Sequence, residues 1–182
     1  MCADVTYKLI AAGDGGVGKT TLLKRYVEGT FDLNTHMTIG VEIHKKTIEF
    51  NKGLVADLQL WDFGGQERFR FFLDSFVMGA NAAILMFDLT RVSSLENLDE
   101  WVDICRKYDP NLPILLVGSK LDLEEMISVD MEDALKMKEK HHCIDFLKVS
   151  SKSGHNVHKV FELLTYYLFN KNQLKDKVAI QT

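Results

Sequence analysis

A glycine-rich segment between an apolar run and an amphipathic segment constrains this chain more than any other feature. Residues 13–20 read Gly-Asp-Gly-Gly-Val-Gly-Lys-Thr and match the pattern G-x-x-x-x-G-K-[ST]. The run before them is apolar, and after them the apolar side chains recur at helical spacing. Because glycines carry no Cβ, the backbone N–H groups of such a loop can close around phosphate oxygens. The order strand, glycine loop and helix therefore predicts a phosphate-binding loop.

Two side chains at the end of this loop have specific expected roles. The Lys19 ammonium is placed to reach the β- and γ-phosphates of a nucleotide, and the Thr20 hydroxyl is placed to ligate Mg²⁺. The N-terminus of the following helix adds partial positive charge. A glycine turn that merely joins a strand to a helix is the alternative, and the agreement between the motif and its flanking segments disfavours it.

Composition limits the class of protein. With 182 residues, the chain is the right size for one domain with a full core. Its net charge of −4 argues against a protein whose main partner is nucleic acid. No apolar run has membrane-spanning length, and the N-terminus lacks the basic and apolar regions of a secretory leader. The three cysteines have no metal-ligand spacing, so we expect a cytoplasmic protein with reduced thiols.

Predicted strands and helices alternate along the chain. The predicted strands are residues 5–12, 41–50, 54–62, 82–89, 114–118 and 144–149, the second and third forming a hairpin. One predicted helix follows the glycine loop, and a short one ends near Gly79. Three more cover residues 95–105, 130–140 and 157–168. This alternation predicts a single α/β P-loop NTPase domain, with a six-stranded mostly parallel sheet, one antiparallel edge strand and helices on both faces. We assign residues 1–170 to the domain and residues 171–182 to a polar, flexible C-terminal tail.

A carboxylate and a glutamine follow the third predicted strand. Asp62 closes that strand, where a carboxylate can hold a water bound to Mg²⁺, and Gly65 can present its N–H to a γ-phosphate. The Gln66 amide can donate to and accept from one water at once, as the positioning of a nucleophile requires. An aspartate at a strand end is often only a turn cap, but the run Gly-Gly-Gln-Glu beside it favours phosphate chemistry.

Two further polar loops follow later strands. Residues 118–122 read Gly-Ser-Lys-Leu-Asp, and residues 150–152 read Ser-Ser-Lys. The Asp122 carboxylate can accept two hydrogen bonds from guanine, from N1–H and the exocyclic amine, whereas adenine offers no matching pair of donors. Either loop alone could be an ordinary polar loop. Ligands of such sheets bind outside the carboxyl ends of the strands, so both loops at strand ends favour a guanine nucleotide.

These residues resemble the Ras superfamily of small GTPases from residue 5 to about residue 170. The specific matches are the phosphate loop and the run Trp61-Asp62-x-x-Gly65-Gln66-Glu67. The segment Thr38-Ile39-Gly40-Val41-Glu42, with Arg68-Phe69 later, is most similar to the Rab branch.

The resemblance implies a small GTPase (G) domain that switches between GTP and GDP states with Mg²⁺. It implies that Thr38 coordinates Mg²⁺ and the γ-phosphate in the GTP state, and that Gln66 orients the attacking water. Phe31 would pack against the guanine, Lys120 would lie along it, and Ser151 N–H would meet its O6 with support from Lys152. The implied catalytic residues are Gln66, Lys19 and Thr38, and the implied metal ligands are Thr20, Thr38 and Asp62. The implied nucleotide-binding residues are Gly15, Gly16, Val17, Gly18, Lys19, Thr20, Thr21, Phe31, Thr38, Gly65, Lys120, Asp122, Ser150, Ser151 and Lys152.

The same resemblance implies partner proteins. We find no arginine positioned in cis, because Arg68 and Arg70 are better explained as surface contacts. Intrinsic hydrolysis should then be slow, and a GTPase-activating protein would supply an arginine that accelerates it by about 10³ to 10⁵. Exchange factors and effectors, in membrane traffic or signalling, would bind two switch loops at residues 30–40 and 63–76. Apolar residues near these loops are candidates for an effector surface, although some must belong to the core: Ile39, Val41, Trp61, Phe69, Phe71 and Phe72.

Three departures from the family pattern bear on function. Ser119 stands where the family has an asparagine that contacts the base and ties its loop to the phosphate loop, so we expect weaker nucleotide affinity and faster exchange. The chain has no C-terminal cysteine for prenylation and has Cys2 where myristoylation needs glycine. Either a lipidated tail has been removed, or the protein works without a lipid, or a partner supplies the membrane contact, and we expect that contact to be only indirect or transient. Residues 34–37 contain no aromatic side chain to cover the nucleotide.

Two alternatives stay open at this stage. A pseudo-GTPase scaffold that binds nucleotide without switching is favoured by Ser119 and opposed by the intact set Lys19, Thr20, Thr38, Asp62 and Gln66. An ATPase of the same class is disfavoured by Asp122. We expect a monomer, which is the default of the family.

Overall fold

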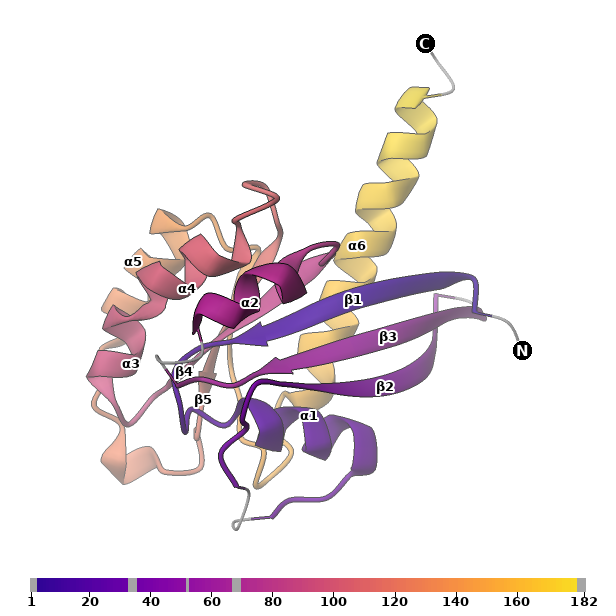
Figure 1. The fold of residues 1–182 in the computed structure, drawn as a ribbon. Helices are drawn as coiled ribbons and strands as arrows, with labels where there is room; N and C mark the ends of the chain where they lie inside the picture. Colours follow the sequence, from indigo (N-terminus) through magenta and orange to yellow (C-terminus); the bar gives the residue numbers. More distant parts are fainter. Residues whose placement is uncertain (1–2, 33–35, 52, 67–69, 180–182) are drawn as a thin grey trace.

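A six-stranded sheet forms the centre of the computed structural model, which describes residues 3–32, 36–51, 53–66 and 70–179 (Figure 1). The strands are β1 (Val5–Ala12), β2 (Val41–Phe50), β3 (Leu54–Phe63), β4 (Ala82–Asp88), β5 (Ile114–Ser119) and β6 (Asp145–Lys148). Their order in the sheet is β2-β3-β1-β4-β5-β6. Only the β2–β3 pair is antiparallel among these strands, which confirms the predicted sheet with its antiparallel edge.

Helices cover both faces of the sheet, as predicted (Figure 1). They are α1 (Lys19–Glu28), α2 (Arg70–Val77), α3 (Val92–Glu96), α4 (Leu98–Cys105), α5 (Met131–Lys140) and α6 (Val157–Ala179), with a 3₁₀ turn η2 (Glu124–Met126). One buried cluster joins α1 and α6 to one face of the sheet, and a second joins α2, α4 and α5 to the other. Both faces of the central strands are therefore buried, which explains their nearly continuous apolar sequences.

Two helices differ from the sequence prediction. The helix expected over residues 95–105 is divided at Asn97 into α3 and α4. Helix α6 continues to Ala179 instead of ending near Leu168, and Figure 1 shows it projecting beyond the sheet. Residues 169–179 contain no glycine or proline to end the helix, and lysine, glutamine and leucine favour helical backbone. Most of the segment expected to form a polar tail is thus helical.

The topology gathers five loops at one edge of the sheet. Strands β1, β4, β5 and β6 run parallel to β3, so the loops that follow β1, β3, β4, β5 and β6 leave from the same edge. These loops carry the predicted site residues. Among the described residues, no helix is both long enough and apolar enough to cross a membrane.

Candidate nucleotide-binding site

The loops at this edge surround a cavity of about 400 Å³. Its lining residues come from the phosphate loop and from the segments that precede β2 and follow β3, β5 and β6: Gly15, Gly16, Val17, Gly18, Lys19, Thr20, Thr21, Phe31, Asp32, His36, Met37, Thr38, Phe63, Gly65, Gln66, Ser119, Lys120, Asp122, Leu123, Ser151 and Lys152. All predicted site residues are in this set except Asp62 and Ser150, which are buried next to it. The fold therefore brings together residues that are far apart in the sequence.

The phosphate loop has the backbone conformation that its glycines permit. Gly16 and Gly18 have φ angles of 75° and 95°, a region that side chains with a Cβ rarely adopt. Lys19, the first residue of α1, is buried, and its Nζ donates to the carbonyl oxygens of Gly13 at 2.6 Å and Asp14 at 2.8 Å. The Lys19 ammonium is thus held at the phosphate loop, where it is expected to contact the nucleotide phosphates.

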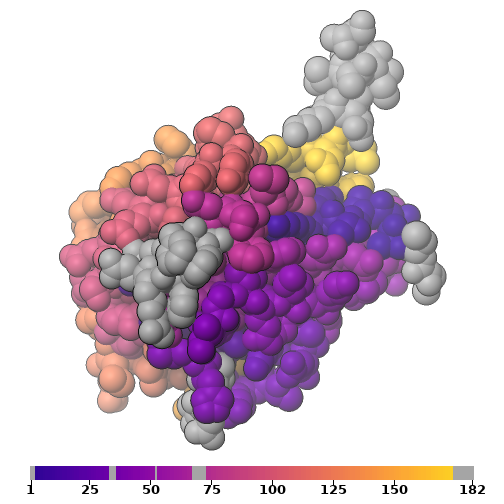
Figure 2. Space-filling view, viewed as in Figure 1, coloured from indigo at the N-terminus to yellow at the C-terminus, as the bar shows by residue number. Residues whose placement is uncertain are grey.

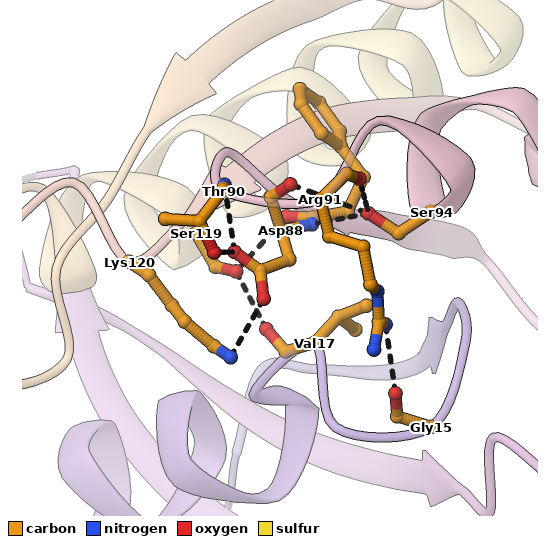
Figure 3. Close-up of polar contacts among 9 residues, drawn as sticks. Gly15, Val17, Asp88, Thr90, Arg91, Ser94, Ser119 and Lys120 are labelled. Atoms are coloured by element: carbon orange, nitrogen blue, oxygen red, sulfur yellow. Dashed lines mark hydrogen bonds and ion pairs between the residues drawn. The ribbon is translucent and has the colours of Figure 1, made fainter. Parts of the chain in front are cut away.

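Side chains from the segment 91–101 hold the phosphate loop from outside. The Trp101 indole N–H and the Asn97 amide donate to the two Asp14 carboxylate oxygens, at 2.8 Å and 2.7 Å. The Arg91 guanidinium donates to the Gly15 carbonyl oxygen at 2.8 Å (Figure 3). None of these three contacts is predictable from the sequence, because no local pattern links the residues to a loop about 80 positions earlier. Arg91 thus approaches the phosphate loop, whereas Arg68 and Arg70 were the arginines considered from the sequence. Arg91 does not line the cavity.

Three oxygen-bearing side chains converge beside Lys19. The Thr20 hydroxyl donates to Asp62 Oδ2 at 2.5 Å and lies 2.7 Å from the Thr38 hydroxyl, which is 3.2 Å from the same carboxylate oxygen. Burial raises the pKa of the Asp62 carboxyl above its usual value, against the opposing effects of the two hydroxyls and of the Lys19 charge. Hard oxygen ligands with at least one carboxylate are what Mg²⁺ prefers, so this group fits the metal that the family resemblance implies.

The segment after β3 lies directly against the phosphate loop. A Cβ on Gly65 would overlap the backbone of Asp14 and Gly15, so only glycine fits there. Gln66 lines the cavity beside Met37. The predicted residues Arg68 and Phe69 lie outside the described residues, as do the side chains of Arg70, Phe71 and Phe72.

At the opposite end of the cavity lies Ser119, which stands where the family pattern has an asparagine. Its buried hydroxyl is 2.6 Å from the Val17 carbonyl oxygen and 2.9 Å from that of Phe87 (Figure 3). The first contact joins the loop after β5 to the phosphate loop. A serine hydroxyl has one proton to donate, and a carbonyl oxygen can only accept, so both contacts draw on the same proton. The Ser119 hydroxyl proton is therefore directed at backbone carbonyl oxygens of the protein.

Its neighbours in the loop after β5 are also paired. Lys120 lies 2.7 Å from Asp88 Oδ2 (Figure 3). Burial would raise the pKa of Asp88, but hydrogen bonds from Lys120 and Thr90, with the Lys120 charge, hold it below its usual value. Asp122 is exposed at the cavity, and its Oδ1 accepts a hydrogen bond of 2.6 Å from the Ser150 hydroxyl. One carboxylate oxygen of Asp122 is thus fixed by a second loop, which orients the group.

The glycine loop, the oxygen cluster and the oriented carboxylate together define a P-loop domain of the guanine-nucleotide class. Residues 8–170 match the Ras family, and the chain belongs to that family. It is 38% identical over 172 residues to the mouse Ras-related protein Rab-19, covering 94% of this chain and 79% of the relative. It is 36% identical over 176 residues to the Ras-related protein RABA1b of Arabidopsis thaliana, covering 94% and 81%. The predicted resemblance to the Rab branch is confirmed, and the chain is a Rab-like small GTPase.

Proposed function

We propose that this small GTPase is a molecular switch that hydrolyses bound GTP slowly and signals through two segments, residues 30–40 and 63–76, the second of which includes most of α2. The observation that carries the proposal is the arrangement of one cavity. At one end, Lys19 lies beside the converging oxygens of Thr20, Thr38 and Asp62, and at the other end lies Asp122. The first group suits a magnesium-bound triphosphate, and the second suits guanine.

In this proposal the groups that surround the cavity have distinct tasks in hydrolysis. Gln66 orients a water in line with the γ-phosphorus, while Lys19 and the backbone N–H of Gly65 stabilise negative charge on the phosphate oxygens. Mg²⁺, when bound, neutralises charge on the β- and γ-phosphates. Thr20, Thr38 and Asp62 would hold it, and Thr38 would also sense whether the γ-phosphate is present.

Slow intrinsic turnover is supported by the position of Arg91, a described arginine that contacts the phosphate loop. Arg91 donates to the Gly15 carbonyl oxygen, so its guanidinium is engaged with the backbone of the loop. A GTPase-activating partner would supply an arginine to the transition state and accelerate the reaction by about 10³ to 10⁵.

A surface that includes the α2 end of the second segment offers an effector an apolar contact. Ile43 and Trp61 pair across β2 and β3, and Phe76 of α2 lies against Trp61 with ring centroids 6.0 Å apart. Ile43 is 48% exposed and Phe76 37%. Figure 2 shows this side of the molecule, with the magenta surface of α2 next to the purple surface of the β2–β3 edge. Exposed apolar side chains on one face favour a protein partner, and membrane traffic or signalling in the cytoplasm is the setting that we propose.

The test is to release and identify the nucleotide that copurifies with the protein, and then to follow added GTP with and without Mg²⁺. We expect GDP in the purified protein and slow conversion of GTP that depends on Mg²⁺. Gln66→Leu should abolish the conversion and leave GTP affinity nearly unchanged, because Gln66 is assigned to the water and not to binding.

A scaffold that binds nucleotide without switching is the second candidate, and the engagement of the Ser119 hydroxyl by two backbone carbonyls favours it. Recovery of unhydrolysed GTP would support the scaffold and contradict the switch, and recovery of no nucleotide would contradict the switch.

A further inference from the structure

Three potential metal ligands lie together between β2 and β3, next to the Thr20–Thr38–Asp62 group. Glu42, His44 and Asp62 each offer one ligand atom, and these atoms all lie within 4.8 Å of one another. The sheet explains this arrangement. Glu42 pairs with Asp62 in the antiparallel register, and His44, two positions further along β2, projects from the same face as Glu42.

Two buried atoms in this cluster have no hydrogen-bond partner among the described residues: His44 Nε2 and Asp62 Oδ1. The His44 side chain is 9% exposed, and Asp62 is 0% exposed. A buried polar atom left unpaired costs about 1–3 kcal/mol, so two of them side by side require an explanation. Glu42 does not provide it, since its Oε1 is 3.6 Å from His44 Nε2, beyond hydrogen-bond distance.

We propose that Glu42, His44 and Asp62 form a binding site for a divalent transition metal of the Zn²⁺ class. Two ligands bound to a tetrahedral metal at their usual distances lie about 3.4 Å apart, close to the 3.6 Å between His44 Nε2 and Glu42 Oε1. The Glu42 side chain is 48% exposed, so it can move to complete the geometry and to admit a water. Water can fill the open coordination position.

The donor set separates this site from the magnesium site. Imidazole nitrogen suits Zn²⁺ and its neighbours in the transition series, whereas Mg²⁺ prefers oxygen ligands alone. The Asp62 carboxylate serves both: Oδ2 accepts from the hydroxyls of Thr20 and Thr38, and Oδ1 has no partner among the described residues. One carboxylate would thus bridge two cation sites of different chemistry.

The experiment is a calorimetric titration of the nucleotide-loaded protein with Zn²⁺, in buffer that contains millimolar Mg²⁺ so that the oxygen-only site is saturated. Titration with Co²⁺ reports ligand geometry through its visible absorption. We expect one equivalent of Zn²⁺ to bind, and both His44→Gln and Glu42→Gln to weaken binding at least about tenfold, because each removes a ligand. Neither residue is assigned to the nucleotide. His142→Gln, which changes an exposed histidine outside the cluster, is the matched control and should bind Zn²⁺ like the wild type.

The alternative arrangement is a hydrogen bond between His44 and one of the two carboxylates, which needs no metal. In that case Zn²⁺ does not bind, or it binds with equal affinity to the wild type and to the variants, and the proposal is wrong. Equal affinity would also result if Zn²⁺ replaced Mg²⁺ at Thr20 and Thr38. Thermal unfolding of each variant checks that it is folded, and if His44→Gln is not, the exposed Glu42 decides the matter through Glu42→Gln.

Discussion

The two ends of the nucleotide cavity are held by different kinds of interaction. At the phosphate end, Lys19 and Thr20 from the motif are paired with neighbouring backbone and carboxylate groups, and Trp101 and Arg91 anchor the loop from outside. At the base end, the Ser119 hydroxyl donates to the Val17 carbonyl oxygen and so links the loop after β5 to the phosphate loop. The phosphate loop is thus anchored from several elements, whereas the base-end residues Lys120 and Asp122 are paired within their own end of the cavity, with Asp88 and Ser150.

From this difference we expect the phosphate end to determine nucleotide affinity and the base end to determine the rate of nucleotide exchange. A hydrogen bond to a charged group contributes about 1.5–3 kcal/mol, so a phosphate end with a buried lysine and a metal can supply most of the binding free energy. The Ser119 proton is directed at backbone carbonyls, so the base receives no hydrogen bond from it. Asp122 then carries guanine selectivity, and the base end sets how fast nucleotide leaves. The predictions below test this division from the largest effect to the smallest.

Asp122→Ala should remove the preference for guanine over adenine nucleotides. The carboxylate accepts two hydrogen bonds from guanine, and their loss should reduce the GDP to ADP affinity ratio by about 10² to 10⁴. Competition binding against a fluorescent nucleotide measures the ratio. The matched control is Glu125→Ala, an exposed carboxylate on the nearby 3₁₀ turn, which should leave the ratio unchanged. A ratio that survives Asp122→Ala would mean that selectivity lies elsewhere at the base end.

Lys19→Ala should weaken GDP and GTP binding alike, by about 100-fold, because the phosphate loses a buried cation. Unlike Asp122→Ala, it should leave the preference for guanine intact. Lys24→Ala on the same helix is the control, since Lys24 does not line the cavity. If Lys19→Ala binds GDP as tightly as the wild type, the phosphate end does not dominate affinity.

Ser119→Asn should slow GDP release by about 3- to 10-fold, because the longer amide can reach the base and still contact the phosphate loop. Stopped-flow release of a fluorescent GDP derivative measures the rate. Ser119→Ala separates the two contributions, since it removes the tie to Val17 without adding a contact to the base, and it should accelerate release. Equal rates in the wild type and Ser119→Asn would contradict the division between the two ends.

Arg91→Ala should have the smallest effect, an increase of about 2- to 5-fold in the GDP dissociation constant. It removes one charge-assisted hydrogen bond to the Gly15 carbonyl oxygen, while Trp101 and Asn97 still anchor the loop through Asp14. If Arg91→Ala instead lowers single-turnover GTP hydrolysis much more than affinity, Arg91 acts on the transition state and the proposed slow intrinsic reaction needs a different explanation.

The phosphate end illustrates what the sequence could predict. The glycine pattern, the apolar runs and the alternation of strands and helices are local, and they were sufficient for the sheet and for the convergence of Lys19, Thr20 and Asp62 at its edge. The parallel topology requires that convergence, because every strand that carries a motif ends at the same edge.

The contacts that the sequence did not predict are long-range. The anchoring by Arg91, Asn97 and Trp101 depends on how α3 and α4 pack beside the phosphate loop, which no short pattern records. The proximity of His44 to Asp62 depends on the register of β2 against β3, because a shift of one residue would place His44 on the other face. The two partners of the Ser119 hydroxyl likewise became visible only in the structure.

The central proposal is that this protein changes conformation with its nucleotide, and amide hydrogen exchange tests it most directly. The protein is loaded with Mg²⁺ and either GDP or a non-hydrolysable GTP analogue, and exchange is followed along the chain. We predict that the analogue slows exchange in residues 30–40 and 63–76, and leaves β4 and β5 unchanged, because Thr38 and Gly65 are released when the γ-phosphate is absent. Identical exchange in the two states would contradict the switch and leave a nucleotide-bound scaffold.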